Sequence, residues 1–298
     1  MLSGIGVVVT LLCVFGGFLM AGGNLSVVFE ALPHEMLTIA GAAIGAFILG
    51  NSMPVVKKAL GGVVHIFKGP RWKESDYRDL LAMLFALLTT FRNGGGMAIE
   101  KHIDRPEESS IFSRYPRLLA DKSLILFICD YLRMMTVNFE DPYQIAEAME
   151  NDNERHHAEE MVPQHAMQLM ADALPALGIV AAVLGVINTM GSIDQPTQIL
   201  GGMIGSALVG TFLGVLLAYG LVGPMASKLQ QTLEAEHRPY TLVKTAVIAY
   251  AQGLPVQVAV ELARRMTPSE FAPSFEELEA ALDEARDQLA TTPLQAAA

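Results

Sequence analysis

Residues 171–228 form two long apolar runs joined by a short polar link, and this stretch limits the possible folds more than any other. Asp, Glu, Lys and Arg are absent between Asp172 and Asp194, and again between Asp194 and Lys228. Each run is longer than the roughly 20 apolar residues that a helix needs to cross a bilayer. The stretch therefore predicts a transmembrane hairpin.

Two further charge-free runs, Leu2–Phe29 and Met36–Val56, predict a first hairpin near the N-terminus. The first run has no basic residues before it and no clear cleavage site of small residues, so we expect a retained span and not a removed signal peptide. Under this interpretation residues 21–35 connect the two helices, and no predicted span contains an ionisable side chain. With 52% hydrophobic residues, the chain of 298 residues is expected to be a polytopic membrane protein.

The basic residues predict the orientation of the spans. Lysine and arginine occur only within residues 57–155 and 228–286, and the short connections contain none. By the positive-inside rule, both termini and the long middle segment are cytoplasmic. We therefore expect an all-α fold with four transmembrane helices in two hairpins and a helical cytoplasmic domain. The expected parts are a first hairpin (1–56), a cytoplasmic helical domain (57–170), a second hairpin (171–228) and C-terminal cytoplasmic helices with a tail (229–298).

The second hairpin contains features that a simple membrane anchor does not need. Pro175 and Pro224 lie near the two ends that share one side of the membrane, and Thr189 and Thr211 place hydroxyl groups inside apolar helices. Proline frees a backbone carbonyl that neighbours or water must satisfy. Small residues recur every three or four positions, which lets helices approach closely. Each feature can serve packing alone, but together they favour helices packed around a wet path.

The cytoplasmic segments are predicted to be helical. Residues 76–92 carry apolar side chains at spacings of three and four, and the glycines in 93–96 then loosen the helix, since each costs about 1 kcal/mol relative to alanine. An Asp-Pro pair at Pro142 starts a long helix that continues into the third span. Ser274, with Glu277 three residues later, predicts the capping box of a short acidic helix.

Charged residues crowd into positions 100–108, which predicts either a solvated face or a surface that repeatedly engages and releases a partner. The net charge of −11 argues against nucleic acid as a partner. His156 and His157 lie among acidic residues, but adjacent histidines point to different sides of a helix, so we expect no metal site. An enzyme is the least expected class, because the sequence shows no nucleophile-and-base grouping and no phosphate loop.

Several longer motifs occur in one order along the chain. They are IFSRYPRLLAD, DYLRMM, LPALGIVAAVLGVINTMGS in the third span, and ALVGTFLGVL at 207–216 with Pro224 eight residues later. Together they resemble the MotA family, the larger stator subunits of bacterial flagellar motors, and the resemblance covers nearly the whole chain. It implies a stator subunit that forms a proton channel with MotB and converts the proton motive force into torque on the rotor.

The resemblance also implies partners. It implies a homo-oligomeric ring, expected to be a pentamer, around a MotB dimer whose span supplies the proton-accepting Asp. It further implies contact with the rotor protein FliG, a place among the lipids of the bacterial inner membrane, H+ as the transported ion, and no cofactor. The residues support this independently, because an ion path without an ionisable group in its own spans must borrow one from a partner.

Particular residues receive expected roles. Ala182 occupies a place where sodium-driven relatives resemble one another in carrying threonine, and alanine offers no oxygen ligand to sodium, so we expect protons. The residues expected to carry function are Thr211, Ala182 and Thr189 in the proton path, Pro175 and Pro224 in coupling, and Arg92 and Glu100 at the rotor interface.

Two other functions stay open. An envelope energiser of the TolQ or ExbB type is also ion-driven, but those relatives resemble three-span proteins, whereas this chain has four predicted spans. A secondary transporter would carry its own substrate site at broken helices and would normally show internal repeats, and the sequence shows neither a repeat nor a buried polar site.

Overall fold

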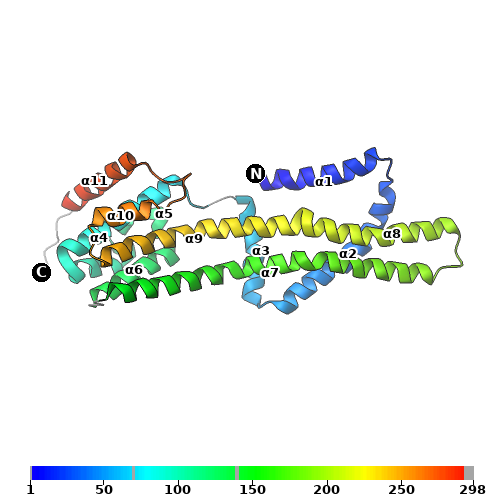
Figure 1. The fold of residues 1–298 in the computed structure, drawn as a ribbon, viewed down its shortest axis with the longest axis horizontal. Coiled ribbons are helices and arrows are strands. Elements are labelled where there is room, and N and C mark those ends of the chain that lie inside the picture. The colour runs from blue at the N-terminus through cyan, green and yellow to red at the C-terminus, as the bar shows by residue number, and fades with distance from the viewer. Residues whose placement is uncertain (1, 69–70, 138–140, 292–298) are drawn as a thin grey trace. The chain divides into compact units, whose positions relative to one another are not determined.

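The computed structural model describes residues 2–68, 71–137 and 141–291, and within these residues all regular structure is helical (Figure 1). The predicted all-α fold is confirmed. The chain divides into two compact units. Met1–Gly69 and Glu159–Leu233 form the first, here named the membrane unit, and Pro70–Ala158 and Glu234–Ala298 form the second, here named the globular unit.

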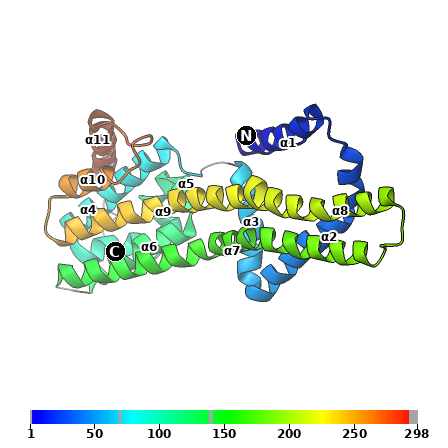
Figure 2. The same cartoon turned by 45° about the vertical axis from the view of Figure 1, so that its right-hand side comes forward.

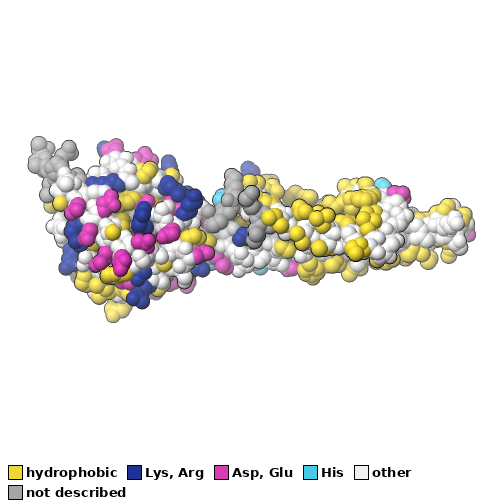
Figure 3. All heavy atoms as spheres, turned by 90° about the horizontal axis from the view of Figure 1, so that it is seen from above, with side chains coloured by type: hydrophobic (Ala, Val, Ile, Leu, Met, Phe, Trp, Pro, Cys, Tyr) yellow, Lys and Arg dark blue, Asp and Glu magenta, His cyan; other side chains and the backbone are white. Residues whose placement is uncertain are grey.

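The membrane unit contains the spans. Within the described residues, four helical segments are long and apolar enough to cross a membrane, which confirms the predicted number. Large apolar side chains are exposed on them, such as Leu37 at 76% and Leu49 at 90%, and Figure 3 shows hydrophobic side chains gathered over this unit. Such a surface requires lipid or another apolar partner. The segments are α1 (Leu2–Met20), α2 (Leu25–Gly50), α7 (Pro142–Met190) and the continuous run Thr197–Ala251.

Helix α2 begins earlier than predicted. The side chain of Asn24 accepts a hydrogen bond of 2.9 Å from the backbone N–H two residues later and caps the helix. Residues 25–35 are therefore helical and do not form a connecting loop. Glu30 and Glu35 therefore lie inside a helix that is long and apolar enough to span the membrane, which the sequence analysis did not predict.

The second hairpin is formed by α7 and α8 (Thr197–Val215), which lie side by side in both ribbon views (Figures 1 and 2). As predicted, α7 starts at Pro142 and runs as one helix through Pro163 and Pro175 into the span. After α8 the chain forms a π-helix at Leu216–Val222 and continues as α9 (Gly223–Ala251). Helix α2 packs against α8, and α3 (Met53–Lys68) follows α2.

The globular unit is built around α4 (Glu74–Ile103), in which residues 80–88 are all buried. The spacing of apolar residues predicted this helix, and it is buried on every side because α6 (Lys122–Thr136), α10 (Val256–Arg264) and α11 (Phe275–Thr291) pack around it. Three short helices connect α4 to α6: η1 (Pro106–Glu108), η2 (Phe112–Arg114) and α5 (Pro116–Leu119).

Local capping fixes several helix ends in this unit. The Ser274 hydroxyl accepts a hydrogen bond of 3.2 Å from the Glu277 N–H, and the Glu277 carboxylate accepts one of 2.7 Å from the Ser274 N–H, which confirms the predicted capping box. Asp121 starts α6 by accepting a hydrogen bond of 3.3 Å from the backbone N–H of Leu124. Gly253, with a φ of 85°, separates α9 from α10.

Candidate functional site

The two helices of the second hairpin touch through glycine. A methyl group built on Gly178 of α7 would lie 2.9 Å from the Gly210 carbonyl oxygen and 3.1 Å from the Cα of Gly214. A methyl group on Gly185 would lie 2.6 Å from the Cβ of Ala207. Backbones approach this closely only where side chains are absent or small. The contact therefore leaves no room for a path between the two helices at these positions.

The structure places the three predicted proton-path residues in different surroundings. Thr211 lines an apolar groove of about 500 Å3 on the side of α8 that faces α1. Ala182 is half-buried on α7. Thr189 is 5% exposed, and its hydroxyl donates a hydrogen bond of 2.9 Å to the Gly185 carbonyl of its own helix. Their shared role in a proton path stays a prediction.

Sequence reasoning missed Glu35, which the structure brings into this site. The residue is 9% exposed, and a methyl group on Gly210 of α8 would lie 2.6 Å from its Oε2 atom. The carboxyl group therefore packs beside α8, one residue before Thr211. The available signal was a spacing of four between Glu35, Ile39 and Ala43, all buried, which places them on one face of a helix.

Pro224 lies two residues after the end of the π-helical segment, with Gly223 between them. Because proline has no N–H, the carbonyl four residues earlier loses its helical partner, and the helix widens over Leu216–Val222. The N–H of Gly223 accordingly donates to the carbonyl of Ala218, five residues back. Widened turns of this kind occur often at functional sites.

Pro175 does not lie level with Pro224 along the hairpin. The carbonyl of Leu174, directly before it, packs against Gly214 of α8, since a methyl group on that glycine would lie 2.7 Å from the Leu174 oxygen. Gly214 precedes Pro224 by ten residues, or about 15 Å of helix. The two prolines therefore lie at different turns of the hairpin.

The two predicted rotor-facing charges lie on separate helical pieces. Arg92 and Glu100 are both exposed on α4. Between them, Gly95 has a φ of 66° and a ψ of −162°, and α4 is kinked there. This backbone region is open to glycine almost alone. The predicted loosening of the helix at residues 93–96 is thus confirmed, and the break in helical geometry lies at Gly95 alone.

Beyond the kink, the surface of the globular unit carries charges of both signs. Arg133 pairs with Asp104 at 3.1 Å and with Asp130 at 3.0 Å. Exposed pairs contribute little to stability, so a partner with complementary charge can replace them at low cost. Burial, together with two nearby cationic side chains, lowers the pKa of His102 on the last turn of α4.

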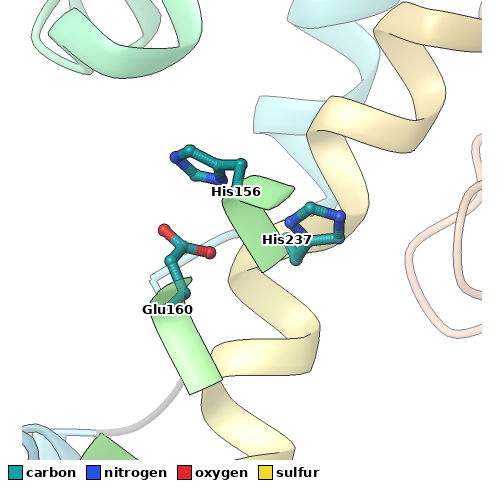
Figure 4. Close-up of side chains that lie close together, drawn as sticks. All are labelled: His156, Glu160 and His237. Atoms are coloured by element: carbon teal, nitrogen blue, oxygen red, sulfur yellow. The ribbon is translucent and has the colours of Figure 1, made fainter. Parts of the chain in front are cut away.

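Histidine side chains from α7 and α9 gather at one place (Figure 4). The ring centroid of His237 is 6.0 Å from that of His156 and 4.4 Å from that of His157. One ring nitrogen of His156 lies within 4.8 Å of one of His237, and Glu160 follows one turn later on α7. Both adjacent histidines thus approach α9, contrary to the argument that they point to different sides of the helix. The expectation that no metal binds here stays a prediction.

These features define a polytopic α-helical membrane protein whose second hairpin is packed backbone to backbone. Residues 4–95 match the family model described as Motility protein A N-terminal, and residues 120–241 match that of the MotA/TolQ/ExbB proton channel family. The chain is 41% identical over 279 residues to Motility protein A of Escherichia coli K12, covering 94% of each chain. It belongs to the motility protein A family.

Solved structures show the same fold. The structure of C. jejuni MotAB matches with a TM-score of 0.69 and 20% identity, over 90% of this chain and 96% of that one. The flagellar MotAB stator complex from Bacillus subtilis matches with a TM-score of 0.67 and 21% identity, over 94% and 98%. At these identities the likeness establishes the fold.

Proposed function

We propose that this chain is the stator subunit of a bacterial flagellar motor and that, with MotB, it forms a proton channel that converts the proton motive force into torque. The observation that carries this proposal is membership of the motility protein A family over nearly the whole chain, on a fold with four candidate spans. The close glycine contact of α7 and α8 supports the proposal, because an ion path can run beside a hairpin that is packed this tightly.

Apolar surfaces that the membrane unit leaves uncovered support the proposed partners. Ile179, Val183 and Ile187 on α7 are each more than half exposed, at 57%, 52% and 61%. We propose that a MotB dimer and neighbouring copies in a pentameric ring cover such faces, with lipid around the rest. The MotB span would supply the proton-accepting Asp, and FliG would meet the surface that carries Arg92 and Glu100.

Coupling would use the continuous helices. One elementary charge that crosses 100 mV releases about 2.3 kcal/mol. Protonation of the partner Asp removes its charge and changes which packing of the hairpin is favoured. Because α7 and α9 each run from the membrane unit into the globular unit without a loop, a change of packing at Pro175 or Pro224 can be carried along the helix.

The proposed location is the bacterial inner membrane, with both termini cytoplasmic. A periplasmic enzyme reporter fused after Gly23 should be active, and a fluorescent reporter that matures only in the cytoplasm should be bright at the C-terminus. The opposite pattern would overturn the orientation.

The alternative of a TolQ or ExbB type of energiser is not favoured, because residues 4–95 match the N-terminal model of motility protein A. The family is a proton channel family, which is not a class of enzyme. A secondary transporter has no further support from the fold, which matches the MotAB structures along nearly its whole length.

The deciding experiment uses cells in which this chain and its MotB partner are the only stator pair. Swimming should persist in sodium-free medium and stop on addition of a proton uncoupler. Cells that express both proteins in the membrane but fail to rotate their filaments would contradict the stator function. Dependence on sodium alone would contradict the choice of ion.

A further inference from the structure

Glu35 is an acidic side chain held between three helices of the membrane unit. Its Oε2 atom lies against Gly210 of α8, and a methyl group built on that glycine would also lie 3.1 Å from the Cβ of Ala181 on α7. Only 9% of Glu35 is exposed. The carboxyl group therefore lies where α2 meets the α7–α8 hairpin.

The helices packed against this carboxyl group offer it no charged partner. Helix α8, and α7 from residue 173 onward, contain no Asp, Glu, Lys, Arg or His. The titratable groups of α2 itself, Glu30 and His34, are exposed, and His34 is close enough to interact electrostatically with Glu35. Lys57–Lys58 belong to α3, beyond the far end of α2. Within the described residues, Oε2 has no hydrogen-bond partner.

A buried carboxyl group in a membrane helix is a candidate site for binding and releasing protons. Burial of its Oε2 atom disfavours the ionised form, whereas the protonated form is neutral. Acidic side chains inside membrane spans are rare, face the interior of the helix bundle, and mark ion pathways. A purely structural role would be served better by a packed apolar side chain.

The geometry points to Glu35 as a proton-exchange site of the ion path, contributed by this chain itself and additional to the partner Asp. The inference rests on the proposed function as a proton channel. Gly210 makes the site possible, because any side chain there would occupy the place of the carboxyl group. Thr211, the next residue on α8, lines the groove on the side that faces α1, so the two polar groups lie at the same level of α8 but on different sides of it.

The chemistry at this site is a proton transfer without an oxidant or reductant. The ionised carboxylate of Glu35 takes H+ from a hydronium ion and leaves water. The protonated carboxyl group then gives H+ to a water molecule or a carboxylate further along the path and becomes ionised again. No covalent bond to carbon forms or breaks.

The first test compares Glu35→Gln with Glu35→Asp and Glu30→Gln in cells where this chain and its MotB partner are the only stator pair. Gln keeps the volume but exchanges no proton, Asp keeps the acid with a shorter reach, and Glu30 is an exposed acid on the same helix. Membrane abundance and co-purification with MotB report assembly, and swimming speed between about pH 5.5 and 8.5 reports proton use.

We expect Glu35→Gln to assemble normally and to swim roughly tenfold slower or not at all, because a positioned proton-transfer group is worth at least that factor. Glu35→Asp should recover part of the speed, and Glu30→Gln should match the wild type. An assembled Glu35→Gln complex that swims at wild-type speed over the whole pH range overturns the inference. Immotile wild-type cells would instead overturn the proposed function.

A second measurement needs no variant to fold. An apolar carbodiimide reacts with protonated carboxyl groups in apolar surroundings, so the wild-type complex in membranes should be labelled at Glu35, and labelling should fall as the pH rises. Peptide mass spectrometry separates this site from the partner Asp. Labelling confined to other carboxyl groups at every pH contradicts the inference, even if Glu35→Gln fails to reach the membrane.

Discussion

Gly178 and Gly214 are in backbone contact across the second hairpin, since a methyl group built on Gly214 would lie 2.9 Å from the Gly178 Cα. Gly214→Ala should therefore destabilise the hairpin by about 1–3 kcal/mol, because a packed interior cannot absorb an extra methyl group. The measurement is the thermal midpoint of the purified complex. Gly202→Ala is the matched control on α8, since nothing lies within 4 Å of its added methyl group, and it should be neutral or stabilising by up to about 1 kcal/mol. Equal midpoints for both variants would refute the contact.

Pro224→Ala should uncouple the motor without preventing its assembly. Alanine returns the missing N–H, so the π-helical turns at Leu216–Val222 can close to α-helical spacing. Membrane abundance should stay normal while swimming is lost. Pro239→Ala, in the same helix α9, should leave swimming intact. Normal swimming of the Pro224 variant would show that the proline has no part in coupling.

Gly95→Ala should strain the kink in α4. The backbone there has a φ of 66° and a ψ of −162°, which costs a residue with a side chain about 1–3 kcal/mol. We expect either a lower thermal midpoint or a straightened helix that moves Glu100 relative to Arg92 and slows swimming. Gly61→Ala on α3, with open space around the added methyl group, is the control. A Gly95 variant that matches this control in both measurements would show that the kink is dispensable.

Acid should weaken the globular unit through His102. Burial, followed by the charges of Lys101 and Arg114, lowers its pKa in the folded state from the ordinary value of 6.5. The unfolded chain then binds the proton more readily, so this stabilisation is fully present above pH 6.5 and is lost as the pH falls from there toward the lowered folded pKa.

The loss at His102 cannot exceed about 1.4 kcal/mol per pH unit. It should appear as a drop in thermal midpoint between about pH 7.5 and 5.5 that is smaller in His102→Gln. His34→Gln, at an exposed position on α2, should keep the full drop. An identical pH dependence in the wild type and both variants would exclude His102 as the source.

Much of the fold follows from short-range physics and was therefore predictable. The bilayer thickness sets the length of a charge-free run, so residues 171–228 predict two spans without any tertiary information. Capping is equally local, because the hydrogen bonds between Ser274 and Glu277 join residues three apart. Pro142 likewise marks the start of α7 by its own fixed φ.

The parts that were not predicted depend on contacts between distant segments. Charge alone assigned residues 21–35 to a loop, but Asn24 caps a helix there and Gly210, from another helix, makes room for the Glu35 side chain. The approach of His237 to His156 similarly joins two helices far apart in sequence. The roles predicted for Thr211, Ala182 and the two coupling prolines stay predictions. Proton transfer and coupling involve a partner and a change of conformation, and a single conformation of one chain contains neither.

Because Glu35 contacts Gly210, substitutions at positions 35 and 210 are expected to occur together during evolution. A lineage that gains any side chain at position 210 must shorten, move or lose the acid at position 35 in the same step, or accept a collision inside its membrane-embedded part. Engineers who wish to retune such a protein for another ion should therefore vary the two positions as a pair.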